Sequence, residues 1–304
     1  MMMTNPDELD KVYHISKNKR PGGLMVKFID ALPLNLKPDT DYSYFRSAYE
    51  LSGYGMNIGI VIKNLFEKDI NRDYYMERHK SKDKRILSID EYETALFCKK
   101  ELLTNPTTKD YFTGKKIVKF QVPIYWNWSL SWGANPPNSM MNSKGMLDML
   151  VIDHEEKSLQ VIDLKTITKS ASTFPHSFVA YGYYIQAYFY WYAVQELIAG
   201  RGVSPAFSST QLEQLKEYTV KPPLFIVVPK VEGSRALVYS LSDDDMRALY
   251  LGMPSFEGVK SLLNRWQFHN ASGEWEFPME VYKNKGTVPL NIFKGQYPSD
   301  EQWF

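Results

Sequence analysis

The chain has 304 residues and a formal net charge of +1; 44% of its residues are hydrophobic, 23% are charged and 14% are aromatic. This composition is typical of a globular protein with a buried core, and it excludes a fibrous repeat or a long disordered tail. Lys and Arg (36 residues) nearly balance Asp and Glu (35), so a polyanion could bind only at a local basic surface. The single cysteine, Cys98, excludes a disulfide framework and an iron–sulfur cluster, which need several cysteines.

The sequence contains no targeting or membrane-spanning pattern. Residues 1–8 lack the basic stretch and apolar core of a signal peptide. The most apolar stretch, residues 178–199, is interrupted by Gly182, Gln186 and Glu196, which argues against a membrane span. We therefore expect a cytoplasmic protein without a membrane partner.

The N-terminal third contains helix patterns separated by breaks. Pro and Gly interrupt residues 1–40, which we expect to form an arm leading into a single domain over residues 41–304. Residues 42–69 have a helical pattern that glycines must interrupt. The basic run 78–85 predicts a solvated loop when it is considered alone.

The middle and C-terminal parts alternate strand and helix patterns. Ser88 and Glu91 predict a capping box at the start of a helix that ends near Thr104. The predicted strands are 116–126, 145–153, 159–166, 224–229 and 236–241, the predicted helices are 178–198, 243–251 and 255–266, and the Ser-, Asn- and Pro-rich residues 127–143 predict a loop. Helices packed on a sheet are the simplest way to bury these faces, so we predict an α/β (α+β) fold.

The most informative residues lie on the predicted strands 145–153 and 159–166. If these strands form a hairpin whose turn is centred on Glu155 and Glu156, then Asp148 lies opposite Asp163, and Lys165 points to the same face. Like charges directly opposite each other are destabilising, and a divalent cation between them removes that repulsion. Two carboxylates, a backbone carbonyl and waters form the oxygen-rich shell that Mg²⁺ prefers. The alternative is a surface hairpin with scattered charges.

These residues resemble the PD-(D/E)XK nuclease superfamily. Asp148 and the run Asp163-Leu164-Lys165 are similar to its core signature, and Gln186 with Tyr190 is similar to the Gln-x-x-x-Tyr motif of RecB-type and lambda exonuclease-type enzymes. The closest likeness is to the exonuclease VIII-like group of phages and prophages. It covers residues 88–198 and implies a restriction-endonuclease-like core, with a central mixed sheet of about five strands over about residues 88–241.

The resemblance implies roles for individual residues. Asp148 and Asp163 resemble the metal-binding carboxylates, Leu164 the residue whose carbonyl binds the metal, and Lys165 the catalytic lysine. The implied metal is Mg²⁺, with Mn²⁺ as an alternative. Gln186 and Tyr190 share one helix face and are expected at the catalytic site. An aromatic core is the alternative for that helix, and we prefer it for Tyr184, Tyr188 and Trp191.

Two positions depart from the family pattern. Gln121 stands where many relatives carry a metal-binding Glu, so it is only a weak candidate ligand. The upstream metal-binding His is absent; the nearest local match places Lys63 there, and His79 lacks the expected context.

The predicted partner is double-stranded DNA with free ends. Candidate contacts are the basic residues Lys80, Lys82, Lys84 and Arg85, as weak candidates, and the loop serines Ser170 and Ser172, which alternatively cap a turn. The resemblance also implies a homo-oligomer and a single-strand annealing protein as a possible partner. The expected function is therefore a metal-dependent exonuclease of phage-type recombination in a bacterial cell. The alternatives are an inactive DNA-binding module and an endonuclease of restriction or repair type.

Overall fold

The computed structural model describes most of the chain. The described residues are 9–33, 36, 41–81, 84–130, 139–231, 233–276 and 278–285. The candidate DNA contact Lys82, parts of the expected N-terminal arm and of the expected loop 127–143, and the C-terminal residues 286–304 lie outside them. Within the described ranges, no helix combines the length and the apolar character that crossing a membrane requires.

The chain divides into two compact units, Met1–Leu102 and Leu103–Phe304. This division differs from the arm and single domain expected from the sequence, because residues 9–102 bury a hydrophobic core of their own. The N-terminal unit contains α1 (Leu9–Val12), β1 (Tyr13–Ser16), α2 (Gly23–Ala31), α3 (Tyr42–Ser52), α4 (Ile58–Glu67), α5 (Asp69–Ser81), β2 (Arg85–Ser88) and most of α6 (Ile89–Thr104).

Local sequence signals explain the helices of the N-terminal unit. Gly53 ends α3 in the left-handed conformation at φ 74°, so the predicted helix 42–69 is two helices. The predicted capping box is confirmed at the start of α6: Glu91 N donates to Ser88 Oγ at 3.2 Å, and Ser88 N donates to Glu91 Oε2 at 2.9 Å.

The C-terminal unit is a mixed α/β structure around a six-stranded sheet. The sheet order is β6 (Gly202–Val203), β3 (Ile117–Leu130), β4 (Ser139–Asp153), β5 (Ser158–Ile167), β7 (Thr219–Pro229) and β8 (Leu237–Ser240). β5 and β7 are parallel, and the other neighbours are antiparallel. The predicted helix-flanked sheet is confirmed at this level, with six strands where about five were expected.

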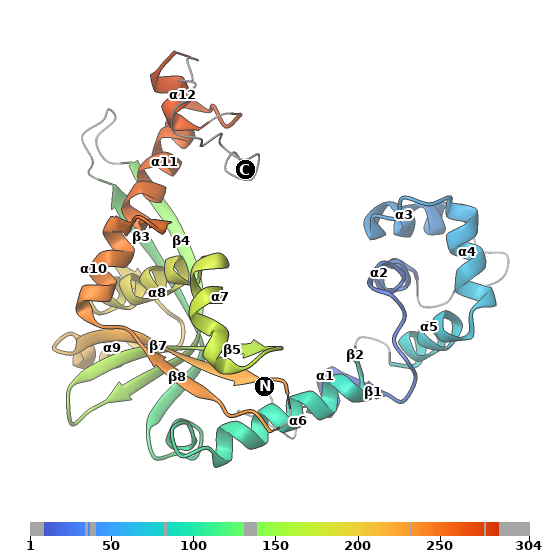
Figure 1. The fold of residues 1–304 in the computed structure, drawn as a ribbon, viewed down its shortest axis with the longest axis horizontal. Helices are drawn as coiled ribbons and strands as arrows, with labels where there is room; N and C mark the ends of the chain where they lie inside the picture. Colours follow the sequence, from blue (N-terminus) through green and yellow to red (C-terminus); the bar gives the residue numbers. More distant parts are fainter. Residues whose placement is uncertain are drawn as a thin grey trace. The chain divides into compact units, whose positions relative to one another are not determined.

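Helices cover one face of this sheet (Figure 1). α8 (Tyr183–Ile198) packs across β3, β4 and β5, and α7 (Phe174–Ala180) and α10 (Asp243–Leu251) extend its cover toward β7. α9 (Ser209–Leu215) and α11 (Val259–Ser272) pack on the same core. The remaining elements are η2 (Lys109–Tyr111), η3 (Ala171–Thr173), β9 (Gly252–Met253), β10 (Phe256–Glu257) and α12 (Met279–Lys283).

Two sequence predictions for this unit are wrong. Residues 127–143 were expected to form a loop, but β3 continues to Leu130 and β4 begins at Ser139. The buried Trp126 and Trp128 pack this extension against α8. Trp128 stacks on Tyr192 with ring centroids 3.9 Å apart. The predicted helix 178–198 is two helices, because Gly182 adopts φ 65° between α7 and α8.

Candidate functional site

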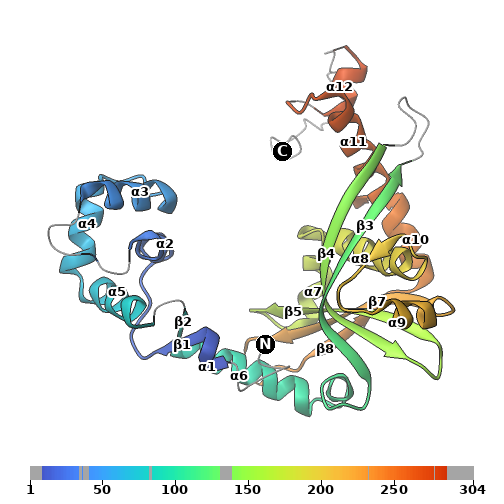
Figure 2. The same cartoon turned by 180° about the vertical axis from the view of Figure 1, so that it is seen from behind.

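The candidate site lies where the sheet forks. β4 and β5 pair from Asp153–Ser158 to Met149–Ile162, which confirms the predicted hairpin register, and their pairing ends there. Asp148 and Asp163 occupy the next position on each strand. Beyond it, β4 continues with β3 as an antiparallel ribbon, whose β3 edge pairs with β6 at Tyr125 and Trp126, while β5 continues beside β7 (Figure 1 and, from behind, Figure 2). The separation of the strands leaves room for side chains between them.

Asp148 bridges the fork. Its Oδ2 accepts a hydrogen bond from the backbone N–H of Leu164 on β5 at 3.0 Å. Its Oδ1 accepts a hydrogen bond from Nε2 of Gln121 on β3 at 3.2 Å. These two bonds hold the carboxylate between three strands.

Gln121 has an unusual backbone conformation at this point. Its φ is 50°, in the left-handed region that residues other than glycine seldom adopt. The β3–β4 pairing is regular at Phe120–Met149 and Val122–Leu147 but skips the Gln121–Asp148 position between them. Such strain costs about 1–3 kcal/mol and clusters at functional sites. The left-handed conformation of Gln121 therefore interrupts the β3–β4 pairing at the position of Asp148.

Asp163, Lys165 and Gln186 form one hydrogen-bonded network. Lys165 Nζ lies 2.8 Å from Asp163 Oδ2 in an ion pair and donates to Gln186 Oε1 at 2.8 Å. Gln186 Nε2 in turn donates to Asp163 Oδ1 at 2.8 Å. The three side chains come from β5 and α8, as the sequence predicted, and each fixes the other two.

The environment of Asp163 disfavours its charge. Its exposed fraction is 3%, and burial raises its pKa above the ordinary carboxyl value of 3.8. The Lys165 ammonium opposes that rise, and the nearby negative charge of Asp148 adds to it. A cation bound beside both carboxylates would relieve this repulsion.

Aromatic rings support Lys165 from the other side. Its Nζ lies 4.4 Å from the centroid of the Tyr183 ring, within the range of a cation–π interaction. Tyr183 stacks on Phe174, with centroids 5.8 Å apart and an interplanar angle of 15°. Tyr183 thus lies beside Lys165 at the start of α8, the helix that also carries Gln186.

Tyr190 lies farther along α8 than Gln186 and packs on β4. A Cβ added to Gly145 would stand 3.0 Å from Tyr190 Cε1, so the ring rests directly on this glycine. Among the polar contacts of the described residues, none joins Tyr190 to the carboxylates. Its catalytic role stays a prediction. The core role preferred for Tyr184, Tyr188 and Trp191 agrees with their packing in the two clusters under α8.

A cavity of about 590 Å³ adjoins Lys165. Its lining residues include three basic side chains and no carboxylate; they are Lys165, Thr166, Ile167, Thr168, Lys169, Thr173, Phe174, His176, Ser177, Tyr181 and Tyr183. Hydroxyl groups and basic side chains suit a phosphate-bearing ligand. Lys169 and His176 were missed at the sequence level, where only the two serines of this loop drew notice.

Those two serines mainly shape the loop. Ser170 Oγ accepts a hydrogen bond from Ser172 N at 3.4 Å and lies 2.9 Å from Ser172 Oγ. This arrangement caps η3 and agrees with the turn-capping alternative. Both side chains are exposed, so neither contact prevents binding to a phosphate.

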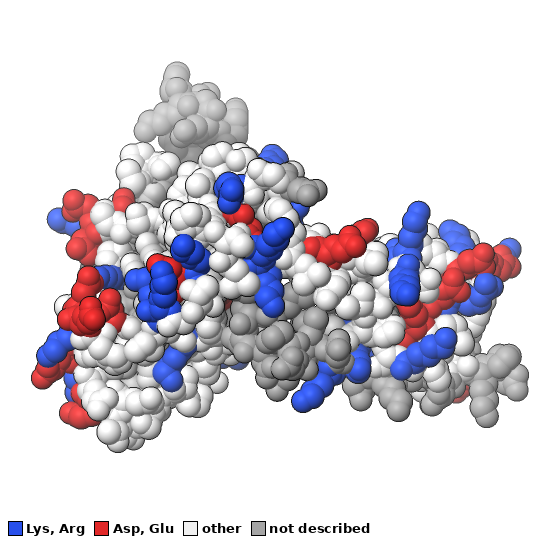
Figure 3. Space-filling model, turned by 90° about the horizontal axis from the view of Figure 1, so that it is seen from below, with Lys and Arg blue, Asp and Glu red and all other residues white. Residues whose placement is uncertain are grey.

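The basic run belongs to the N-terminal unit. Lys80 lies in the last turn of α5, Lys84 precedes β2, and Arg85 begins it. On the face shown in Figure 3, basic side chains are interspersed with acidic ones. Lys63, at the position expected for a metal-binding His, lies on α4 and pairs with Glu67 at 3.8 Å.

The donor set at the fork fits a hard divalent cation. Asp148 and Asp163 would supply two carboxylates, and Leu164 is the residue whose carbonyl the resemblance assigns to the metal. Each carboxylate oxygen has one polar partner, which leaves further lone pairs available. Within the described part of the chain, no cluster of three or more His, Cys, Asp or Glu side chains is placed to hold a metal. Waters would have to complete the shell, which is common for Mg²⁺.

Comparisons with known proteins leave the assignment to this geometry, because no family model and no curated protein matches the chain.

Proposed function

We propose that this protein is a metal-dependent deoxyribonuclease built on a restriction-endonuclease-like core of the PD-(D/E)XK type. The observation that carries the proposal is the group of Asp148, Asp163 and Lys165 at the fork of the sheet. The hairpin that supplies the group, the parallel β5–β7 pair and α8 with Gln186 support the same reading.

The reaction that this group supports best is phosphodiester hydrolysis. Asp148, Asp163 and the Leu164 carbonyl would hold Mg²⁺ or Mn²⁺, which as a Lewis acid supplies charge stabilisation at the scissile phosphate. Gln186 fixes the relative positions of the Lys165 and Asp163 side chains through its two hydrogen bonds. Lys165 then presents a fixed ammonium group that can orient a nucleophilic water and offset the developing negative charge.

The substrate we propose is linear double-stranded DNA, degraded from its ends as in phage-type recombination. The cavity beside Lys165, with Lys169 and several hydroxyls and no carboxylate, supports a polyanionic substrate. A homo-oligomer and a single-strand annealing partner remain proposals that follow from the resemblance.

A second candidate is a DNA-binding module that does not cleave. Gln121 favours it, because a neutral amide stands beside Asp148 where a third carboxylate would strengthen metal binding. In that case the site would bind Mg²⁺ weakly and the protein would retain DNA without cutting it. An endonuclease is the remaining possibility, and it would also cut DNA that has no ends.

The test compares end-labelled linear duplex with closed circular DNA, each with Mg²⁺ and with EDTA. We expect Mg²⁺-dependent loss of the linear DNA alone. Lys165→Ala should abolish the loss, whereas Lys216→Ala, which removes an exposed lysine paired with Glu213, should not. Cleavage of the circle would identify an endonuclease, and retention of uncut DNA would identify the binding module.

A further inference from the structure

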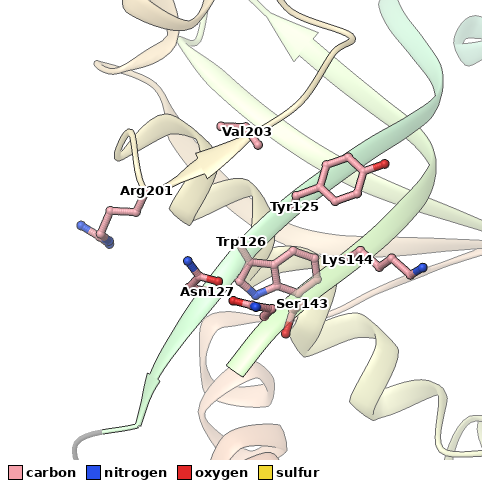
Figure 4. A pocket seen from close by; sticks show the side chains of 8 residues that line it. Tyr125, Trp126, Asn127, Ser143, Lys144, Arg201 and Val203 are labelled. Carbon is pink, nitrogen blue, oxygen red and sulfur yellow. The ribbon is translucent and has the colours of Figure 1, made fainter. Parts of the chain in front are cut away.

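A second cavity, of about 420 Å³, lies on the β3–β4 ribbon away from the fork (Figure 4). Its lining residues are Tyr125, Trp126, Asn127, Asn142, Ser143, Lys144, Arg201 and Val203. None of them is acidic, and the volume is within the range of sites for small molecules. The roles discussed above use none of these residues.

Four of the lining side chains share one face of the ribbon. Tyr125 pairs across the strands with Lys144, and Asn127 pairs with Asn142, so the four lie in a square. Figure 4 shows the Tyr125 ring and the Lys144 side chain extending to the same side. The Tyr125 side chain is 48% exposed, which leaves one face of its ring open for stacking.

The cavity also has unused hydrogen-bonding capacity. Among the described residues, neither the Asn127 amide nor the Asn142 amide has a side-chain hydrogen bond. Trp126 alternates with Tyr125 along β3, so its buried ring lies on the opposite face of the ribbon and adds nothing to this capacity.

Two basic side chains border the cavity, and they differ in whether they form an ion pair. The exposed Lys144 forms no ion pair with any described residue. Arg201 donates from Nε and Nη2 to the buried Glu196 at 2.8 and 2.6 Å, which fixes its guanidinium and leaves its other N–H groups unused by that pair. Figure 4 shows the Arg201 and Lys144 side chains extending to opposite sides, so Lys144 is the cation available to a phosphate group bound beside Tyr125.

We propose that this cavity binds one nucleotide, with the base stacked on Tyr125 and read by the two amides and the phosphate held by Lys144. A planar base carries both donors and acceptors on its edge, and asparagine amides match that pattern. The chemistry is the same for a free nucleotide and for one within a strand. The claim that the nucleotide belongs to the substrate rests on the proposed nuclease function.

The position of the cavity favours a nucleotide within a strand. Lys144 precedes Asp148 by four residues on β4, a separation of about 13 Å at the rise of a strand. That length is close to about four base steps along B-form DNA. A strand whose phosphate lies at the carboxylates would therefore reach the cavity.

The test measures binding by fluorescence anisotropy in EDTA, so that it does not depend on cleavage. The probes are a fluorescein-labelled single strand and the matching duplex, with unlabelled deoxynucleoside monophosphates as competitors. We expect Tyr125→Ala and Lys144→Ala each to weaken binding of the single strand about tenfold, since stacking on one aromatic side chain contributes about 1–3 kcal/mol. Tyr125→Phe keeps the ring, Lys216→Ala removes a lysine outside the cavity, and both should bind normally.

The outcomes separate this proposal from the nuclease proposal. Normal binding by Tyr125→Ala and Lys144→Ala, or no binding of nucleic acid at all, would overturn the cavity assignment even if the protein cleaves DNA. Weaker binding by both variants would support it even if no cleavage occurs. Competition by a monophosphate that is lost in Tyr125→Ala would show that a free nucleotide is sufficient, and its absence would assign the site to a strand.

Discussion

Two carboxylates are equally buried in the C-terminal unit, each 3% exposed, yet their surroundings differ. Glu196, near the end of α8, receives two hydrogen bonds from a single guanidinium, that of Arg201. Asp163, at the fork, shares its lysine with Gln186 and lies near a second carboxylate, Asp148.

The difference distinguishes a closed ion pair from an incomplete one. Glu196 and Arg201 satisfy each other in the bidentate geometry that suits a structural pair. Asp163 and Asp148 lie near each other, and among the described residues Lys165 is the cation that pairs with them, an arrangement that favours an added cation over stability. The exposed fraction alone does not distinguish Glu196 from Asp163. Their hydrogen-bond and charge partners do.

The largest expected effect follows from removing one carboxylate at each place. We expect Asp163→Ala to lower metal-dependent cleavage of linear duplex by at least about 10³-fold, because charge stabilisation at the reacting phosphate depends on it. Glu196→Gln should leave the cleavage rate within a few-fold of wild type. Equal losses in the two variants would mean that the fork holds no reactive site.

The next effect concerns stability. Arg201→Ala leaves the Glu196 charge buried without its partner and should lower the free energy of unfolding by about 2 kcal/mol. Lys216→Ala breaks an exposed pair with Glu213 and should cost under about 0.5 kcal/mol. Urea unfolding of the two variants compares these costs directly. If Arg201→Ala were as stable as wild type, the Glu196 carboxylate would not depend on Arg201 as its partner.

A smaller effect tests the contact between α8 and β4. Gly145→Ala places a methyl group against the Tyr190 ring and should cost about 1 kcal/mol in unfolding free energy. Tyr190→Phe keeps the ring and should retain stability, and its cleavage rate tests the catalytic role predicted for Tyr190. A loss of cleavage in a stable Tyr190→Phe protein would place the tyrosine hydroxyl in the reaction, and normal cleavage would overturn that role for the hydroxyl.

The smallest effect is a pH dependence of stability. Because burial raises the folded-state pKa of Asp163 above 3.8, the folded protein binds this proton more tightly than the unfolded chain. The contribution of Asp163 to stability is therefore fully present below pH 3.8 and is lost as pH rises through the raised pKa. Urea titrations across that interval should show wild type losing stability relative to Asp163→Ala. An opposite trend would mean that Lys165 outweighs burial.

Much of the fork was predictable from the sequence. The hairpin register follows from apolar alternation on two short strands joined by a polar turn, so the positions of Asp148 and Asp163 could be inferred. The i, i+4 spacing on a helix indicated a common face for Gln186 and Tyr190. However, only Gln186 reaches the network, because Tyr190 lies over Gly145, a contact that no helical spacing encodes.

The parts that were missed depend on long-range packing. The extension of β3 and β4 carries Ser and Asn residues that resemble a loop locally, and it is strand because Trp126 and Trp128 bury their rings against α8. The positive φ of Gln121 could not be predicted either, since none of its neighbours in the sequence requires it. The separate N-terminal core was missed because its helices are short and its buried residues are widely spaced.

The tight turn at residues 154–157 sets the strand register that places Asp148 opposite Asp163. Asp153 Oδ1 accepts hydrogen bonds from Glu155 N at 3.0 Å and Glu156 N at 2.9 Å, and Lys157 closes the turn at φ 47°. A strand slipped by one residue turns every side chain to the opposite face. One residue inserted into this exposed turn would therefore separate Asp148 from Asp163 without touching either of them. Substitutions in this turn should accordingly be tolerated, whereas changes in its length should not.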